Sequence, residues 1–321
     1  MAKEVLDMIA IYKSDMTPQG GLKQITNIEP GSWINLVAPL EQELMLVSRK
    51  TGVPLEFLKA ALDDEESSRI DIEDKVHLIL VDIPFTEMED NSLVYDTYPL
   101  AIIHTENELI TVCLKNSKII TDFINGKMKS FFTFKKSRFI LQLLQRVSMH
   151  FLLYLRQIDK KSVLIEKRLY KSMQNKELIQ MLSLEKSLVY FNTSLKSNEV
   201  TLEKLLKLDL VNRYEEDQDL LDEVIIDNKQ AIEMATIYSE TITGTMDAFA
   251  SVISNNVNVV MKFLAAVTIV MNIPAIIAGI YGMNVRNMPM ADSPYGFVFV
   301  IGIMLLATLL VSWFLKKRDM F

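Results

Sequence analysis

The chain has 321 residues, of which half are hydrophobic and 23% are charged, and its formal net charge is −7. This length leaves room for one or two soluble domains besides any membrane-spanning segment. The acidic balance argues against a nucleic-acid-binding protein, because such a protein needs a basic face for phosphates. Cys113 is the single cysteine, which excludes a disulfide framework.

Residues 1–136 have the mixed pattern of an N-terminal cytosolic α/β domain. Runs of β-branched and apolar residues predict strands at residues 9–12, 33–37, 76–83, 93–104 and 108–114. Helices are expected at residues 39–50, 55–62 and 117–125. Pro39 suits a first helical turn and Gly52 a helix end. Asn107 lies between the last two predicted strands and predicts a hairpin.

From residue 137 the pattern becomes helical. Glycine is absent between Gly126 and Gly244, and apolar residues recur at helical spacing. This predicts two or three cytosolic helices over residues 137–198. A stalk helix is expected over residues 199–262, beginning near Ser197 or Asn198 and continuing into the apolar segment that follows. With that segment it would have ~80 residues and a length of ~120 Å, so it should pack against copies of itself.

Two uncharged apolar segments follow, at residues 263–284 and 295–315. Each is long enough to cross a hydrocarbon core of ~30 Å. Residues 285–294 form a short outer loop between them, and residues 316–321 form a basic tail. The sequence therefore predicts an integral membrane protein with a large extramembrane domain.

Basic residues flank the two spans unequally. Lys262, Lys316, Lys317 and Arg318 lie at one membrane face, and Arg286 lies at the other. The positive-inside rule places the first face, and with it both termini, in the cytosol.

The first span ends in Tyr281-Gly282-Met283-Asn284. Here the chain resembles the CorA family of magnesium channels, whose hallmark is Gly-Met-Asn at the outer end of the first of two C-terminal helices. The resemblance extends over the whole chain. Trp33-Ile34-Asn35-Leu36 is similar to an early strand of the family, and residues 61–66 are similar to the acidic segment that follows it.

The resemblance implies an α+β cytosolic domain, with a mixed sheet and flanking helices, followed by a very long stalk helix, two transmembrane helices and assembly into a homopentameric funnel. The implied function is Mg²⁺ influx through the cell membrane, driven by the membrane potential. Co²⁺ and Ni²⁺ are further expected ions. The sequence has no P-loop and no recognisable nucleophile motif, so no enzyme activity is expected.

A stripe of small and polar residues follows one face of the long helix at steps of three and four residues. Its members are Asp247, Ser251, Ser254, Asn258, Met261, Ala265, Thr268, Asn272, Ala275 and Gly279. A period near 3.5 is typical of helices that supercoil around a common axis. Polar groups are costly against lipid, so the stripe is expected to line an axial pore. The alternative is that small residues permit close helix packing.

Magnesium prefers octahedral oxygen ligands and gives up water reluctantly. A ring of Asn284 side chains, with the backbone carbonyls of Gly282 and Met283, would bind the hydrated ion as the selectivity filter. Met261 and Leu264 are candidates for a hydrophobic gate that closes by dewetting, or for ordinary packing between helices.

By resemblance, cytosolic Mg²⁺ closes the channel by binding carboxylates between neighbouring subunits. The matching residues are Asp63, Asp64, Glu65 and Glu66, together with Asp222 and Glu223 of the stalk. The alternative is an acidic loop and a helix face that are simply solvated.

The chain departs from the common family pattern at the lower filter, with Asn272, Pro274 and Ala275, and in the outer loop, where Asp292 is the sole acid. Two other functions therefore stay open. One is a transporter of zinc or another divalent ion on the same scaffold, possibly coupled to protons. The other is a membrane-anchored sensor or structural protein.

The three histidines, His77, His104 and His150, lack metal-ligand spacing and are expected to be structural.

Overall fold

The computed structural model describes residues 9–15, 21–89, 92–128, 130–172, 175–208, 215–284, 288–290, 293–318 and 320. The chain divides into an N-terminal unit, Met1–Gly244, and a C-terminal unit, Thr245–Phe321. Helix α6 has residues in both units.

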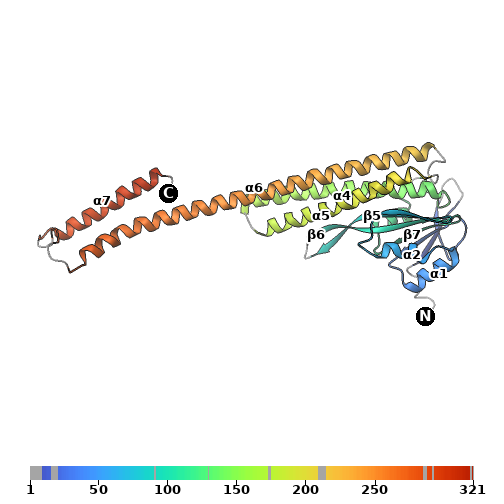
Figure 1. Ribbon diagram of the computed structural model, residues 1–321, viewed down its shortest axis with the longest axis horizontal. Helices are drawn as coiled ribbons and strands as arrows, with labels where there is room; N and C mark the ends of the chain where they lie inside the picture. Colours follow the sequence, from blue (N-terminus) through green and yellow to red (C-terminus); the bar gives the residue numbers. More distant parts are fainter. Residues whose placement is uncertain are drawn as a thin grey trace. The chain divides into compact units, whose positions relative to one another are not determined.

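The N-terminal unit contains a sheet of seven described strands (Figure 1). They are β1 (Ile9–Ser14), β2 (Leu22–Ile25), β3 (Trp33–Val37), β4 (Arg69–Glu73), β5 (Val76–Glu89), β6 (Ser92–His104) and β7 (Leu109–Cys113). Their order is β2-β1-β3-β7-β6-β5-β4, and the β3–β7 pair is parallel while the other neighbours are antiparallel. The mixed sheet and the five predicted strands are confirmed. The sequence did not reveal β2 and β4, because they are short and at least half of the residues in each are charged or polar.

Helices α1 (Glu41–Thr51) and α2 (Leu55–Lys59), with the short 3₁₀ helix Ala60–Leu62, pack on one face of the sheet. The helix end expected at Gly52 is confirmed, whereas Pro39, expected in the first helical turn, lies before the N-cap residue Leu40. The Leu40 N–H donates to Glu43 Oε2 at 2.7 Å at the start of α1. Gly52 ends the helix with φ of 74°, a left-handed conformation that favours glycine, and donates to Ser48 O at 2.8 Å. Leu44 and Leu58 are among the buried residues of this core.

The other face carries α3 (Lys118–Ile124), α4 (Lys136–Ser172) and α5 (Asn175–Leu205). Trp33 is fully buried there, and its Nε1 donates to Thr111 Oγ1 at 2.8 Å. Its ring meets Phe139 edge to face, with ring centroids 5.1 Å apart. The tryptophan of the predicted early strand is therefore a core residue that anchors α4.

The predicted start of the stalk helix is wrong. Helix α5 continues through Asn198 to Leu205, and α6 (Glu215–Tyr281) begins ten residues later. Asn198 is 3% exposed, and its side chain pairs with backbone groups at the edge of β5 that no neighbouring strand pairs. Its amide accepts from Asp82 N and donates to Asp82 O, each at 2.8 Å, and it also accepts from Ser68 Oγ at 2.9 Å. β4 pairs with β5 only as far as Leu80, so these backbone groups would otherwise lack partners.

Within the N-terminal unit, α6 is fixed to α4 and α5 by polar contacts. Arg138 donates to Asp217 Oδ1 at 2.8 Å, and the Asp217 side chain is 7% exposed. Asn228 is also buried, and its Nδ2 donates to Leu195 O at 3.0 Å. These contacts hold the acidic start of α6 against α4 and α5.

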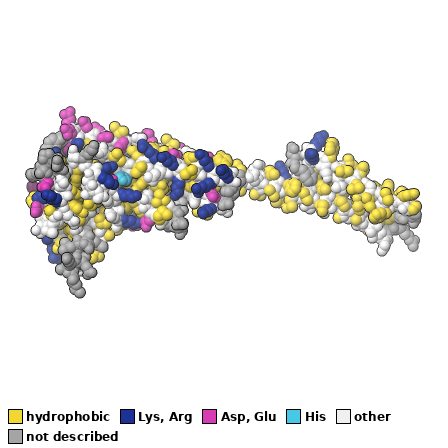
Figure 2. Space-filling view, turned by 180° about the vertical axis from the view of Figure 1, so that it is seen from behind, with side chains coloured by type: hydrophobic (Ala, Val, Ile, Leu, Met, Phe, Trp, Pro, Cys, Tyr) yellow, Lys and Arg dark blue, Asp and Glu magenta, His cyan; other side chains and the backbone are white. Residues whose placement is uncertain are grey.

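The C-terminal unit contains the end of α6 and helix α7 (Gly296–Lys317), which returns alongside it (Figure 1). Among the described residues, α6 and α7 are the helices long and apolar enough to cross a membrane. Figure 2 shows mainly hydrophobic side chains on the surface of this unit, whereas charged side chains gather over the N-terminal unit. This separation fits a membrane-embedded part and a water-exposed part.

Candidate functional site

One face of α6 is covered by the rest of the C-terminal unit. Ala266 is fully buried, and half-buried residues continue this face: Val267, Val270, Ile273, Pro274, Ile277 and Tyr281. Helix α7 has a matching row that ends at buried Leu315: Val300, Met304, Ala307, Thr308, Val311 and Ser312. The two rows recur at helical spacing, so α7 covers this face of α6.

The predicted stripe lies on the opposite face of α6. At 100° per residue, the direction of the stripe between Met261 and Gly279 differs by roughly 180° from that of the face under α7. Every stripe residue from Asp247 to Gly279 is exposed in the single chain, as is Leu264. The stripe is therefore free to meet other surfaces, and α7 does not compete for it.

Two hydroxyl groups of the stripe donate back to the helix. Thr268 Oγ1 donates to Leu264 O at 2.8 Å, and Ser251 Oγ donates to Asp247 O at 3.0 Å. Because each O–H is used within the helix, the outward side of each oxygen offers lone pairs only. These residues therefore present hydrogen-bond acceptors, which suit a hydrated cation.

The Gly-Met-Asn segment follows the last turn of α6. Gly282 N–H donates to Ala278 O at 2.8 Å, and Met283 N–H donates to Ile280 O at 3.2 Å. A Cβ at Gly282 would lie 3.3 Å from Ala278 O, which is a tight contact. Asn284 is exposed, and no described residue of the chain hydrogen-bonds its side chain. Its amide is thus available to ligands or to other subunits.

The expected regulatory carboxylates occupy two separate surfaces of the chain. Asp63, Asp64, Glu65 and Glu66 lie in the turn before β4. Glu66 forms an ion pair with Arg69, and Asp63 Oδ1 accepts from the Glu65 N–H at 3.1 Å.

Asp222 and Glu223 are exposed on α6, and Glu223 accepts from Gln145 at 3.4 Å. Within the described part of one chain, no three His, Cys, Asp or Glu side chains gather as metal ligands.

The basic end of α7 lies beside aromatic rings. Lys317 Nζ is 5.6 Å from the centroid of the Trp313 ring, and the Arg318 guanidinium is 5.6 Å from that of Phe314. Such amphipathic residues are typical of a membrane interface. Arg286 and Asp292 lie outside the described residues.

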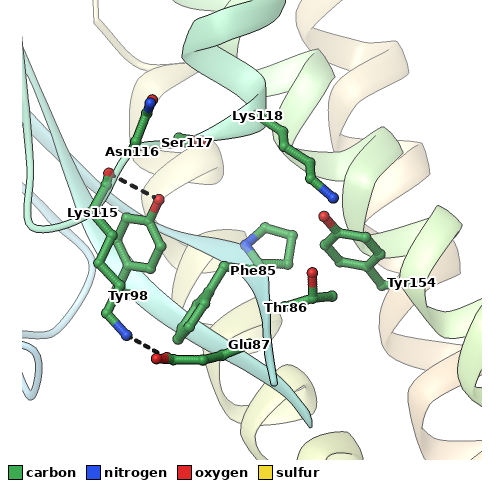
Figure 3. A pocket seen from close by; sticks show the side chains of 10 residues that line it. Phe85, Thr86, Glu87, Tyr98, Lys115, Asn116, Ser117, Lys118 and Tyr154 are labelled. Carbon is green, nitrogen blue, oxygen red and sulfur yellow. Dashed lines mark hydrogen bonds and ion pairs between the residues drawn. The ribbon is translucent and has the colours of Figure 1, made fainter. Parts of the chain in front are cut away.

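A pocket of about 260 Å³ lies between β5, β6, the β7–α3 turn and α4 (Figure 3). On one wall, Lys115 pairs with Glu87 at 2.7 Å and lies over the Phe85 ring, 4.4 Å from its centroid. Nearby, burial raises the pKa of Cys113 to about 12, which keeps the thiol protonated and unreactive. The pocket therefore offers no activated cysteine nucleophile.

The histidines were predicted to be scattered, but two of them meet. His77 on β5 lies directly opposite His104 on β6, and their ring centroids are 5.7 Å apart. His150 lies on α4, where its Nδ1 is 2.9 Å from Arg146 O. Sequence spacing missed the pair because 26 residues of a long hairpin separate its members, and the strand register decides which residues face each other.

The model of the CorA-like Mg²⁺ transporter protein family matches residues 30–317. The cobalt/magnesium transport protein CorA of Methanocaldococcus jannaschii is 28% identical over 294 residues, which cover 89% of this chain and 90% of that protein.

The complete structure of the CorA magnesium transporter from Methanocaldococcus jannaschii superposes with a TM-score of 0.82 at 24% identity, covering 96% of each chain. The full-length CmaX protein superposes with a TM-score of 0.71 at 16% identity, covering 98% of each chain. Because both structures are less than 25% identical to this chain, these similarities concern the fold alone. Because the family model spans nearly the whole sequence, the chain belongs to the CorA-like Mg²⁺ transporter family.

Proposed function

We propose that this protein is a magnesium influx channel in the cell membrane, assembled as a homopentamer around the polar stripe of α6. The observation that carries the proposal is the position of the stripe, exposed and opposite the face that α7 covers. In a ring of copies, α6 would line the axis and α7 would face lipid. Both termini would be cytoplasmic, in keeping with the basic residues at Lys262 and at the end of α7.

The selectivity filter is a ring of Asn284 amides, supported by the backbone carbonyls of Gly282 and Met283. A neutral amide oxygen can hydrogen-bond the water shell of Mg²⁺ without removing it, which suits an ion that dehydrates reluctantly. The exposed amide of Asn284 and its lack of a described partner within the chain support this role.

Below the filter, Asn272, Asn258 and Asp247 form further polar rings. Thr268 adds acceptor oxygens, and the small residues Gly279, Ala275 and Ala265 leave space for hydrated ions. Met261 and Leu264 are 59% and 57% exposed in the single chain and form the hydrophobic gate.

The membrane potential drives the flux. A divalent ion that crosses a potential of about 100 mV, negative inside, gains ~4.6 kcal/mol, twice the value for a single charge. Magnesium therefore enters without ATP.

Cytosolic Mg²⁺ closes the channel by bridging carboxylates of neighbouring subunits. Asp63, Asp64 and Glu65 of one copy would face Asp222 and Glu223 of the next. Glu66 contributes less than its neighbours, because Arg69 already neutralises it. Carboxylates held together repel each other until a cation binds, so occupancy shifts the balance between two arrangements of subunits.

Cobalt and nickel are further candidate cargo ions, and the name of the Methanocaldococcus jannaschii relative includes cobalt. Transport of zinc or another divalent ion, possibly coupled to protons, is the alternative on the same scaffold. A membrane-anchored sensor is the second alternative, and it predicts no ion flux.

The test is Mg²⁺ uptake into liposomes that contain the purified protein and a magnesium-sensitive dye, with an inside-negative potential. We expect Asn284→Ala to lower uptake on the order of tenfold or more, because the filter loses its ligands. Asn255→Ala is the matched control, since Asn255 is an exposed residue of α6 that belongs neither to the proposed filter nor to the stripe.

Equal Mg²⁺ uptake by both variants and the native chain would refute the filter. Zinc flux in place of Mg²⁺ flux, with accompanying protons, would establish the alternative transporter. No flux of any divalent ion would favour the sensor.

A further inference from the structure

We propose that His77 and His104 form a binding site for a divalent transition-metal ion in the N-terminal unit. The two residues are Cα partners across the antiparallel β5–β6 pair, so their side chains leave the sheet on the same face. Their rings meet edge to face, with centroids 5.7 Å apart and an interplanar angle of 66°.

The strand neighbours show which face carries the pair. Leu78 and Ile103 follow and precede the two histidines, and both belong to the core under α1 and α2. Because side chains alternate along a strand, His77 and His104 point to the opposite face. Both residues are half-buried, so part of each side chain is accessible to an ion in water, although the Nδ1 atoms are buried.

The pair lies in a row across four strands. Ile72 of β4 is the partner of His77, and Leu109 of β7 is the partner of His104. Ile72 is 52% exposed and Leu109 is fully buried, so the row runs from solvent into the core. The half-buried histidines occupy the boundary between solvent and core.

His77 has a buried ring nitrogen that needs a partner. Its Nδ1 is inaccessible, and no described residue hydrogen-bonds it. Such a group costs free energy in a folded protein unless a ligand or water satisfies it. Burial also lowers the pKa of His77, which favours the neutral imidazole that metals bind.

Imidazole ligands select the class of ion. They favour Co²⁺, Ni²⁺ and Zn²⁺, whereas Mg²⁺ prefers oxygen ligands. No third His, Cys, Asp or Glu completes the cluster within the described part of the chain, so water fills the remaining positions. The site therefore distinguishes transition-metal ions from Mg²⁺, and it does not depend on the proposed transport function.

The first test is equilibrium dialysis of the full-length chain, without a polyhistidine tag, against Ni²⁺ in saturating Mg²⁺, which occupies oxygen sites. We expect one Ni²⁺ per chain to bind at the histidine pair. His77→Gln and His104→Gln should each weaken this binding on the order of tenfold or more, because one of two protein ligands is lost. His150→Gln is the matched control and should bind Ni²⁺ as the native chain does.

The second test uses the native chain and so does not depend on whether a variant folds. Diethyl pyrocarbonate modifies accessible imidazoles, and mass spectrometry can follow all three histidines separately. We expect Ni²⁺ to slow modification of His77 and His104 together and Mg²⁺ to have no effect, while His150, which is 9% exposed, should react little under any condition. Unchanged modification in Ni²⁺, equal protection by Mg²⁺, or full Ni²⁺ binding by a folded His77→Gln variant would overturn the proposal.

Discussion

Replacing Asn198 should lower the stability of the N-terminal unit strongly, and the effect should be local. One buried side chain supplies three hydrogen bonds, two to the backbone of Asp82 and one to Ser68. Asn198→Ala removes all three and leaves their partners poorly satisfied. At roughly 1 kcal/mol per bond, the loss of stability should be about 3 kcal/mol.

Asn228→Ala is the graded control for this prediction. Asn228 is 2% exposed, similar to Asn198, but it makes one hydrogen bond, to Leu195 O. Its loss should cost about 1 kcal/mol. For a unit of this size, each kcal/mol lowers the midpoint of thermal unfolding by roughly 2–4 °C. The expected decreases are therefore about 6–12 °C for Asn198→Ala and about 2–4 °C for Asn228→Ala.

The assay combines thermal unfolding by circular dichroism with hydrogen exchange read by mass spectrometry. If the Asn198 amide acts as a substitute strand, peptides from the outer half of β5 should exchange faster in Asn198→Ala, while peptides from β3 should change less. Equal midpoints for the two variants, or faster exchange spread evenly over the sheet, would refute the reasoning.

Two further predictions concern the half-buried carboxylate of Asp82 and Gly282 of the proposed filter. Burial raises the pKa of Asp82 from 3.8 to about 6, so the folded state binds more protons than the unfolded state between these values, and stability falls as pH rises through this window. At pH 7.5 Asp82→Asn should unfold at a higher temperature than the native chain, because the neutral amide avoids the cost of burying a charge. Near pH 4 the native carboxyl is protonated, so the two midpoints of thermal unfolding should be similar. An equal difference between the midpoints at both pH values would contradict the burial argument. Gly282→Ala should reduce Mg²⁺ uptake, because the added Cβ would lie 3.3 Å from Ala278 O. Gly302→Ala is the control and should leave uptake unchanged, because no atom lies within 4 Å of its added Cβ. Similar uptake by both variants would count against a geometric role for Gly282.

The sequence predicted the elements whose patterns are strong. Long apolar runs gave α7 and the end of α6, and β-branched runs gave β5 and β6. The end of α5 could not be predicted, because no glycine or proline lies between Gly126 and Gly244 to mark it. Asn198 became buried through a contact with β5, more than a hundred residues away, which no local pattern records.

In the candidate site too, local patterns could be predicted from the sequence, whereas contacts between distant segments could not. The spacing of the stripe predicted that its residues share one face of α6, because helical periodicity is a local property, and the pore role of this face stays a prediction. The pairing of His77 with His104 depends on strand register, so residue spacing alone could not reveal that the two rings meet. The proposed carboxylate site joins two segments that lie in separate places on one chain, and its geometry depends on contacts between copies.

The composition of the first span also determines whether its side chains can exchange protons with their surroundings. Between Phe263 and Asn284, the first span contains no Asp, Glu, His, Lys or Arg. Side chains that relay protons by gaining and releasing them near neutral pH are carboxylates and imidazoles, and amides, hydroxyls and thioethers do not act in this way. Ions that follow the part of the stripe within this span, from Ala265 to Gly279, would therefore cross it without exchanging protons with its side chains, and acidification of either side would leave that part in the same ionic state; Asp247 lies outside the span.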